Sequence, residues 1–216
     1  MPTHQRIAGF GSLAAAACFL FSFFMYAVVV TPPVDETPLS LLKNIQENYV
    51  GLYAVYFVVY AAFGFSLVPM TVGFYEQQKF HQPNLAKATA IFGIIWVALV
   101  VATSFVFTVG MTHSIKLAET DINKAADLWF VCLVIVDSLG GGNEIIGGIW
   151  IGLFSLTANR FQLVSTSLAV LGIIVGIAGL FTVLPQEEPK MVFGLCLLIW
   201  FLWLGFAQIK QAKSNE

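Results

Sequence analysis

Two carboxylates, Asp137 and Glu144, lie inside one apolar stretch of the 216-residue chain. An acid near the middle of a bilayer costs at least about 2.5–3.5 kcal/mol on insertion scales, so such residues usually face the bundle interior and often mark ion, proton or ligand sites. A spacing of seven puts both on one face of an unbroken helix, about 10 Å apart. The sequence therefore predicts a polar site that binds or translocates a small molecule or an ion.

The residues between the two acids are Ser138, Leu139, Gly140, Gly141, Gly142 and Asn143. Each glycine costs about 1 kcal/mol of helix propensity. Asn143 is suited to cap a second half-helix, with Glu144 near its positive end. As one continuous helix the segment 125–158 would measure about 51 Å, against about 30 Å of hydrocarbon. We therefore expect this helix to be broken or kinked at the three glycines, which would act as a hinge, and Asp137, Asn143 and Glu144 to be the binding residues.

The same acids could also be purely structural. Glu144 could lie close to the cytoplasmic edge of the membrane, and Asp137 could hydrogen-bond a neighbouring hydroxyl and hold the bundle together. The candidate neutral partners are Tyr56, Tyr60, Thr103, Ser104 and Thr108.

The composition is that of a polytopic membrane protein. The chain is 58% apolar and 10% charged, whereas soluble domains carry about 25% charged residues. This excludes a disordered chain and an ordinary soluble enzyme, and a net charge of −2 offers no basic surface for nucleic acid. Because the backbone must satisfy its own hydrogen bonds in lipid, apolar segments of this length are helices. We predict an all-α bundle of six transmembrane helices in a single domain, residues 1–216, with spans at 7–31, 50–75, 87–112, 125–158, 161–184 and 191–209.

The longest connection, 32–49, is expected to contain a short amphipathic helix on the membrane face. Thr37 followed by Pro38 is a helix-start signal, and Leu39, Leu42 and Ile45 recur every three residues. This helix is either a plain interfacial connector or a lid over a binding site.

Lysine and arginine are distributed six against four between the two sets of loops, which favours cytoplasmic termini. Trp129, Tyr49, Tyr53 and Tyr75 lie near span ends and are interpreted as interfacial belt residues.

Small residues predict where helices approach closely. Gly148 with Gly152, and Gly172 with Gly176, form such faces, which we expect to pack inside one chain. Pro69, within the second span, is expected to kink it.

No catalytic, metal or cofactor motif is present in the sequence. The spans lack histidine pairs for haem and a mid-span lysine for a Schiff base, and metalloprotease and nucleophile-elbow signatures are absent. The three cysteines lie in apolar runs, so no disulfide framework is expected. A non-enzymatic protein without cofactor, metal or nucleic-acid partner is therefore favoured.

Several elements of the carboxyl-terminal half carry a resemblance. They are Gly140 to Glu144, Gly148-Ile149-Trp150, Asn159-Arg160, Leu171-Gly172 with Gly176 and Gly179, Phe193-Gly194, and Trp200 to Gly205. Together they resemble a family of small bacterial multi-pass membrane proteins of unknown function. The resemblance implies six helices and the bacterial inner membrane, and it implies no activity and no site residues. Asn159 departs from the apolar residue expected there.

Three classes of function remain open at this point. The first is a membrane protein that binds or translocates a small molecule or ion at the polar site around Asp137. The alternative is a non-catalytic accessory, assembly or sensory subunit with a protein partner. The third, less favoured, is a membrane-embedded enzyme, which would need a lipid or quinone substrate. Membrane lipid surrounds the chain in each case.

Overall fold

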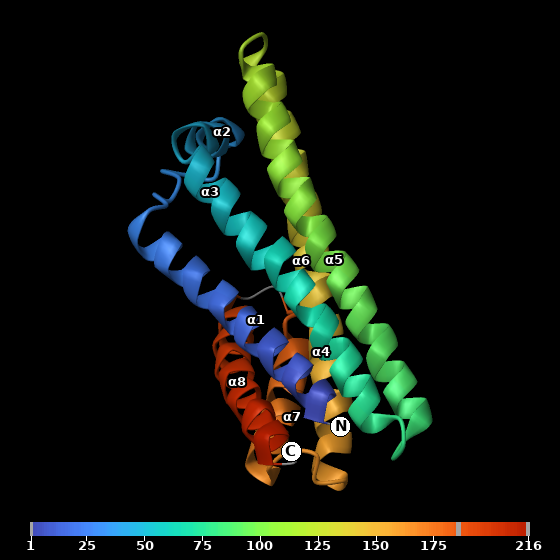
Figure 1. The fold of residues 1–216 in the computed structure, drawn as a ribbon. Helices are drawn as coiled ribbons and strands as arrows, with labels where there is room; N and C mark the ends of the chain where they lie inside the picture. Colours follow the sequence, from blue (N-terminus) through green and yellow to red (C-terminus); the bar gives the residue numbers. More distant parts are fainter. Residues whose placement is uncertain (1, 185–186, 215–216) are drawn as a thin grey trace. The chain divides into compact units, whose positions relative to one another are not determined.

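The computed structural model describes residues 2–184 and 187–214, with side chains at 3–139, 144–184 and 188–214. This part of the chain is almost entirely helical and contains no strand (Figure 1). The helices are α1 (Pro2–Val28), α2 (Pro38–Glu47), α3 (Tyr49–Tyr56), the π-helical segment η1 (Phe57–Ala62), α4 (Phe63–Gln78), α5 (Pro83–Ala118), α6 (Ile122–Arg160), α7 (Thr166–Phe181) and α8 (Glu187–Ser214).

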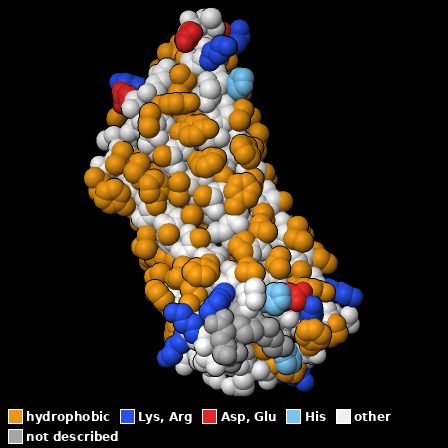
Figure 2. All heavy atoms as spheres, in the orientation of Figure 1, with side chains coloured by type: hydrophobic (Ala, Val, Ile, Leu, Met, Phe, Trp, Pro, Cys, Tyr) orange, Lys and Arg blue, Asp and Glu red, His pale blue; other side chains and the backbone are white. Residues whose placement is uncertain are grey.

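Within the described residues, five helical stretches are long and apolar enough to span a membrane: Thr3–Val28, Tyr49–Gln78, Pro83–Ala118, Ile122–Arg160 and Glu188–Ser214. The segment expected to form a further span gives α7, which has only 16 residues. Hydrophobic side chains cover much of the face drawn in Figure 2. The described chain is therefore all-α, and five of the six expected spans are confirmed as helices long and apolar enough to cross a membrane.

The helices extend beyond the apolar segments from which they were predicted. The 36 residues of α5 extend for about 54 Å, against a hydrocarbon core of about 30 Å. The helix continues through Thr112, His113 and Lys116 to Ala118 because its backbone hydrogen bonds do not depend on side-chain polarity.

The chain divides into two compact units. Unit 1 comprises residues 1–17, 64–98 and 141–216, and unit 2 comprises residues 18–63 and 99–140. The helices α1, α5 and α6 contribute a segment to each unit, and so does the continuous stretch from α3 to α4.

Unit 1 is built around an aromatic core. Its largest fully buried side chains are Trp96, Trp150, Trp200, Phe74, Phe154 and Phe201. The Phe74 ring stacks on Phe154 with centroids 3.6 Å apart and on Trp150 at 5.0 Å. Because lipid tails are as apolar as these rings, close packing and not exclusion from water holds such a core together.

Glycines let α6 and α7 approach closely in unit 1. A Cβ atom added at Gly148 would lie 2.8 Å from the carbonyl oxygen of Gly176, and one at Gly176 would lie 3.0 Å from the Cα of Gly152. A Cβ at Gly172 would collide with the Ser155 side chain. The prediction that these small-residue faces pack within one chain is confirmed.

The two ends of the chain pack together in unit 1. The Ser12 hydroxyl of α1 donates to the carbonyl of Phe201 in α8 at 2.7 Å, and Gly9 lies against Gly205. The later residue of α1, Ser12, contacts the earlier residue of α8, Phe201, so the two helices run antiparallel. The start of α1 and the end of α8 therefore lie at the same end of unit 1.

The expected interruption of the 125–158 segment is not observed. The structure has one helix, α6, that continues through Gly140, Gly141 and Gly142, whose surroundings lie outside the described side chains. An interrupted backbone in lipid would leave several unsatisfied polar groups at several kcal/mol each. That penalty exceeds the helix propensity lost at three glycines, about 1 kcal/mol each. A kink at these glycines is not confirmed.

Candidate functional site

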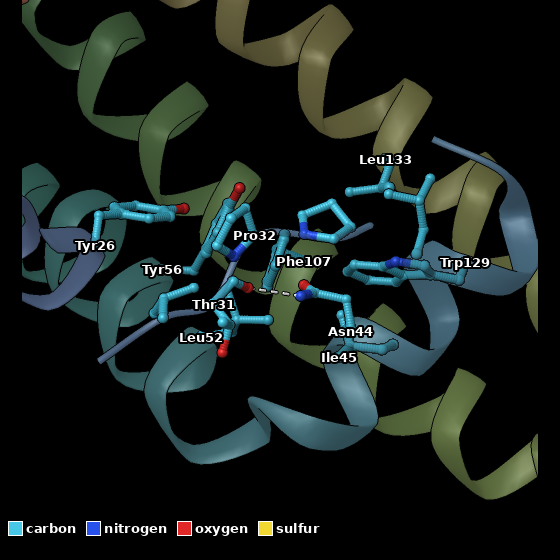
Figure 3. A pocket seen from close by; sticks show the side chains of 13 residues that line it. Tyr26, Thr31, Pro32, Asn44, Ile45, Leu52, Tyr56, Phe107, Trp129 and Leu133 are labelled. Carbon is cyan, nitrogen blue, oxygen red and sulfur yellow. Dashed lines mark hydrogen bonds between the residues drawn. The ribbon is translucent and has the colours of Figure 1, made fainter. Parts of the chain in front are cut away.

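A cavity of about 340 Å³ lies in unit 2, beneath α2 (Figure 3). Its lining comes from the end of α1 and the loop after it, from α2 and α3, and from α5 and α6. The lining residues are Tyr26, Val30, Thr31, Pro32, Pro33, Leu41, Asn44, Ile45, Leu52, Tyr56, Phe107, Trp129 and Leu133. The volume falls within the range of small-molecule sites, about 300–1,000 Å³.

One wall of the cavity is a row of aromatic rings. Tyr56 stacks face to face on Phe107, and Phe107 meets Trp129 edge-on with centroids 4.9 Å apart. Tyr60 extends the row behind Tyr56 at 5.5 Å. These rings have few rotatable bonds, so they give the cavity a rigid apolar wall.

The π-helical segment helps to position this wall. Tyr56 immediately precedes η1, where the backbone leaves the α-helical hydrogen-bond pattern. The Tyr56 carbonyl accepts a hydrogen bond from the Ser104 hydroxyl of α5 at 3.1 Å. This bond joins the second and third expected spans next to the cavity, and single π turns are frequent at functional sites.

The polar groups of the cavity are few. The hydroxyl groups of Tyr26 and Tyr56 are two of them. The Asn44 amide donates to the Thr31 carbonyl at 2.7 Å (Figure 3). The described lining contains no charged side chain, so the cavity suits a neutral molecule better than an ion.

The amphipathic helix predicted after Thr37 is confirmed as α2. Thr37 caps it by accepting from the Ser40 N–H, and Pro38 occupies its first turn. Its buried residues, Leu42 and Ile45, point toward the protein. Since Leu41, Asn44 and Ile45 line the cavity, α2 covers it.

Side-chain amides hold α2 to the end of α1. The Asn48 side-chain oxygen accepts from both the backbone N–H and the hydroxyl of Thr31, at 3.1 Å each. The Asn48 amide nitrogen donates to the Asn44 carbonyl at 3.1 Å. These bonds fix the helix that covers the cavity.

Replacing Asn48 by Ala should speed hydrogen exchange of the α2 amides about tenfold, because it removes hydrogen bonds with a net value of about 1–1.5 kcal/mol. The measurement is hydrogen–deuterium exchange in lipid nanodiscs. The control is Gln46→Ala on the exposed side of the same helix. Equal exchange rates in the two variants would show that Asn48 does not hold α2 in place.

The structure separates the two predicted acids. Asp137 belongs to unit 2 and its side chain is exposed, whereas Glu144 belongs to unit 1 and is partly buried. Asp137 does not line the cavity. The side chain of Asn143 lies outside the described residues. A binding role for these three residues stays a prediction.

Most of the hydroxyls considered as partners for the acids are used elsewhere. Thr103 and Thr108 donate to the carbonyls four residues back in their own helix, at 2.9 and 2.8 Å. The Ser104 hydroxyl donates to the Tyr56 carbonyl at 3.1 Å. Within the described residues, no group of three metal-binding side chains occurs.

The interpretation of Trp129 as a belt residue is wrong. Its side chain is 1% exposed and lies in the core of unit 2, against Phe107 and the cavity. Trp129 lies near the predicted end of a span, which suggested an interfacial ring. The helix α6 begins seven residues earlier, at Ile122, and residues of α2 line the same cavity as Trp129. Tyr26 and Phe107 also line the cavity, and no motif or spacing in the sequence around them indicates this.

The chain was compared with protein-family models, with curated proteins and with solved structures. None of the three comparisons gives a match, so the function is argued from the geometry of this chain.

Proposed function

We propose that this integral membrane protein binds a small, neutral, amphipathic molecule in the unit 2 cavity. The observation that carries the proposal is the cavity of about 340 Å³, with aromatic and aliphatic walls and a few clustered polar groups, covered by α2. A pocket that is largely apolar, with a small number of oriented polar groups, is the usual form of a small-molecule site.

The ligand is expected to place its apolar part against the rings of Phe107 and Trp129 and a hydroxyl or carbonyl group near Tyr26 and Tyr56. A phenol both donates and accepts, so either group can be recognised. An ion is disfavoured because a charge buried without a partner is strongly unfavourable.

The cavity is expected to lie near one face of the membrane. From Lys87 to Phe107, α5 rises about 30 Å, the thickness of the hydrocarbon core. A molecule dissolved in the bilayer could then enter beside α2. Movement of α2, held by Asn44 and Asn48, would open and close the site.

Release or translocation would involve the glycines of α6. The division into units falls between Gly140 and Gly141, where the sequence predicts a hinge. We propose that bending here changes the shape of the cavity.

For topology, we propose that α7 is a sixth, short crossing and that both termini are cytoplasmic. Termini at one end of unit 1 support an even number of crossings. The lysine and arginine bias supports the orientation. The proposed location is a bacterial inner membrane, in line with the resemblance noted in the sequence.

The test uses 1-naphthol, a neutral fluorescent molecule with one aromatic system and one hydroxyl, titrated into the protein in nanodiscs. The wild type should bind it saturably. Leu133→Trp, which fills the cavity, should raise the Kd at least about tenfold, or about 1.4 kcal/mol. Tyr56→Phe should weaken binding by about 1 kcal/mol through the lost hydrogen bond.

The matched control is Val134→Trp, the neighbouring position on α6, which is 49% exposed and does not line the cavity. It should bind as the wild type does. Equal affinity in Leu133→Trp and Val134→Trp would place the probe outside the cavity. Absence of saturable binding to the wild type would favour the accessory-subunit alternative.

A further inference from the structure

A second cavity lies in unit 1 as an open groove between α4 and α5. It has a volume of about 410 Å³ and is lined by Val68, Thr71, Val72, Tyr75, Ala90, Ile94 and Val97. The groove belongs to helices that are long and apolar enough to span a membrane. It is separate from the aromatic cavity, which belongs to unit 2.

A lysine is associated with each helix that forms the groove. Lys79 is the first residue after α4, four positions after Tyr75, and its backbone N–H still donates to the Tyr75 carbonyl at 2.9 Å. On α5, Lys87 lies three residues before Ala90 and seven before Ile94. Residues spaced by three, four, seven and eight share a helix face. Neither lysine lines the groove itself: Lys79 follows the lining residues of α4 and Lys87 precedes those of α5, so both lie at the end marked by Tyr75.

The charge at this end of the groove is positive. The Lys79 ammonium lies 2.6 Å from the Glu76 carboxylate and 5.9 Å from the centre of the Tyr75 ring. Glu76 is also 3.6 Å from His4. Lys87 is exposed, and no ion pair involving it occurs in the described part of the chain. One cation thus remains available after Glu76 has neutralised the other.

We propose that the groove binds one anionic phospholipid, with an acyl chain along Val68, Val72 and Ile94 and the phosphate between Lys79 and Lys87. The apolar lining fits a hydrocarbon chain, and tyrosine beside lysine is suited to the headgroup level of a bilayer. Clustered basic side chains between transmembrane helices are a recurrent site for anionic headgroups.

The groove extends for about 10 Å along α4, from Tyr75 to Val68. Its lining is apolar, and the lysines lie at one end only, so it matches a molecule with one apolar chain joined to an anionic head.

The experiment is native mass spectrometry of the protein released from nanodiscs that contain equal phosphatidylglycerol and phosphatidylcholine. The wild type should retain one phosphatidylglycerol. Lys87→Gln should reduce the preference for phosphatidylglycerol about tenfold. Ile94→Trp, which fills the groove at a residue 64% exposed, should abolish retention.

Two controls separate the groove from general effects. Lys116→Gln removes an exposed lysine at the opposite end of α5, in unit 2. Val109→Trp places the same bulk on the part of α5 that belongs to unit 2, at a residue 51% exposed. Both should retain the lipid, and circular dichroism should show every variant folded. Equal retention of the two lipids by the wild type, retention by Ile94→Trp, or a dimer that Ile94→Trp dissociates would each overturn the proposal. None of these results bears on the aromatic cavity.

Discussion

Replacing Phe74 by Ala is expected to destabilise unit 1 by about 3–5 kcal/mol, the range for truncating a buried aromatic side chain. Phe74 is 0% exposed and contacts Phe154, Trp150 and Trp200, with centroid distances of 3.6, 5.0 and 6.3 Å. In a membrane the loss comes from the cavity and the lost dispersion contacts, because lipid replaces water as the alternative environment.

The measurement is equilibrium unfolding in mixed micelles with increasing dodecyl sulfate. The control is Phe65→Ala on the same helix, at a side chain that is 57% exposed. Its ring faces outward, where lipid can replace it, so its free energy of unfolding should change by less than about 1 kcal/mol. A comparable loss in both variants would mean that the Phe74 ring does not pack as the structure shows.

Replacing Gly148 by Leu should disrupt the contact between α6 and α7 at a cost of at least about 3 kcal/mol, the upper end for overpacking. The added Cβ would lie 2.8 Å from the carbonyl oxygen of Gly176 and 3.0 Å from the Cα of Gly179. Both are backbone atoms, so no side-chain rotation can relieve the clash, and the two helices must separate.

Gly194→Leu is the matched control for this substitution. Among the described residues, nothing lies within 4 Å of a Cβ added at Gly194 in α8. This variant should be neutral or stabilised by up to about 1 kcal/mol, because leucine has the higher helix propensity. The same unfolding assay applies. If the two leucine variants unfold together, the close approach of α6 and α7 is refuted.

The sequence alone determined those features that depend on residues close together in the chain. The apolar segments located five spanning helices, because a backbone in hydrocarbon has no other way to satisfy its hydrogen bonds. Thr37 and Pro38 located the start of α2, because a cap and a first-turn proline act within one helical turn. Gly148, Gly152 and Gly176 identified a packing face, because the lack of a side chain is what allows two helix backbones to approach closely.

Tertiary structure decided where the side chains meet. Tyr26, Tyr56, Phe107 and Trp129 come from four helices, and no spacing in the sequence relates residues so far apart. The π turn at Phe57–Ala62 has no composition signal. The predicted break in α6 relied on intrinsic propensity, which is worth about 1 kcal/mol per glycine and is outweighed by the need to keep backbone groups bonded in lipid. The approximate positions of the apolar helices follow from the sequence, whereas the cavity forms because α2 folds back over α3, α5 and α6.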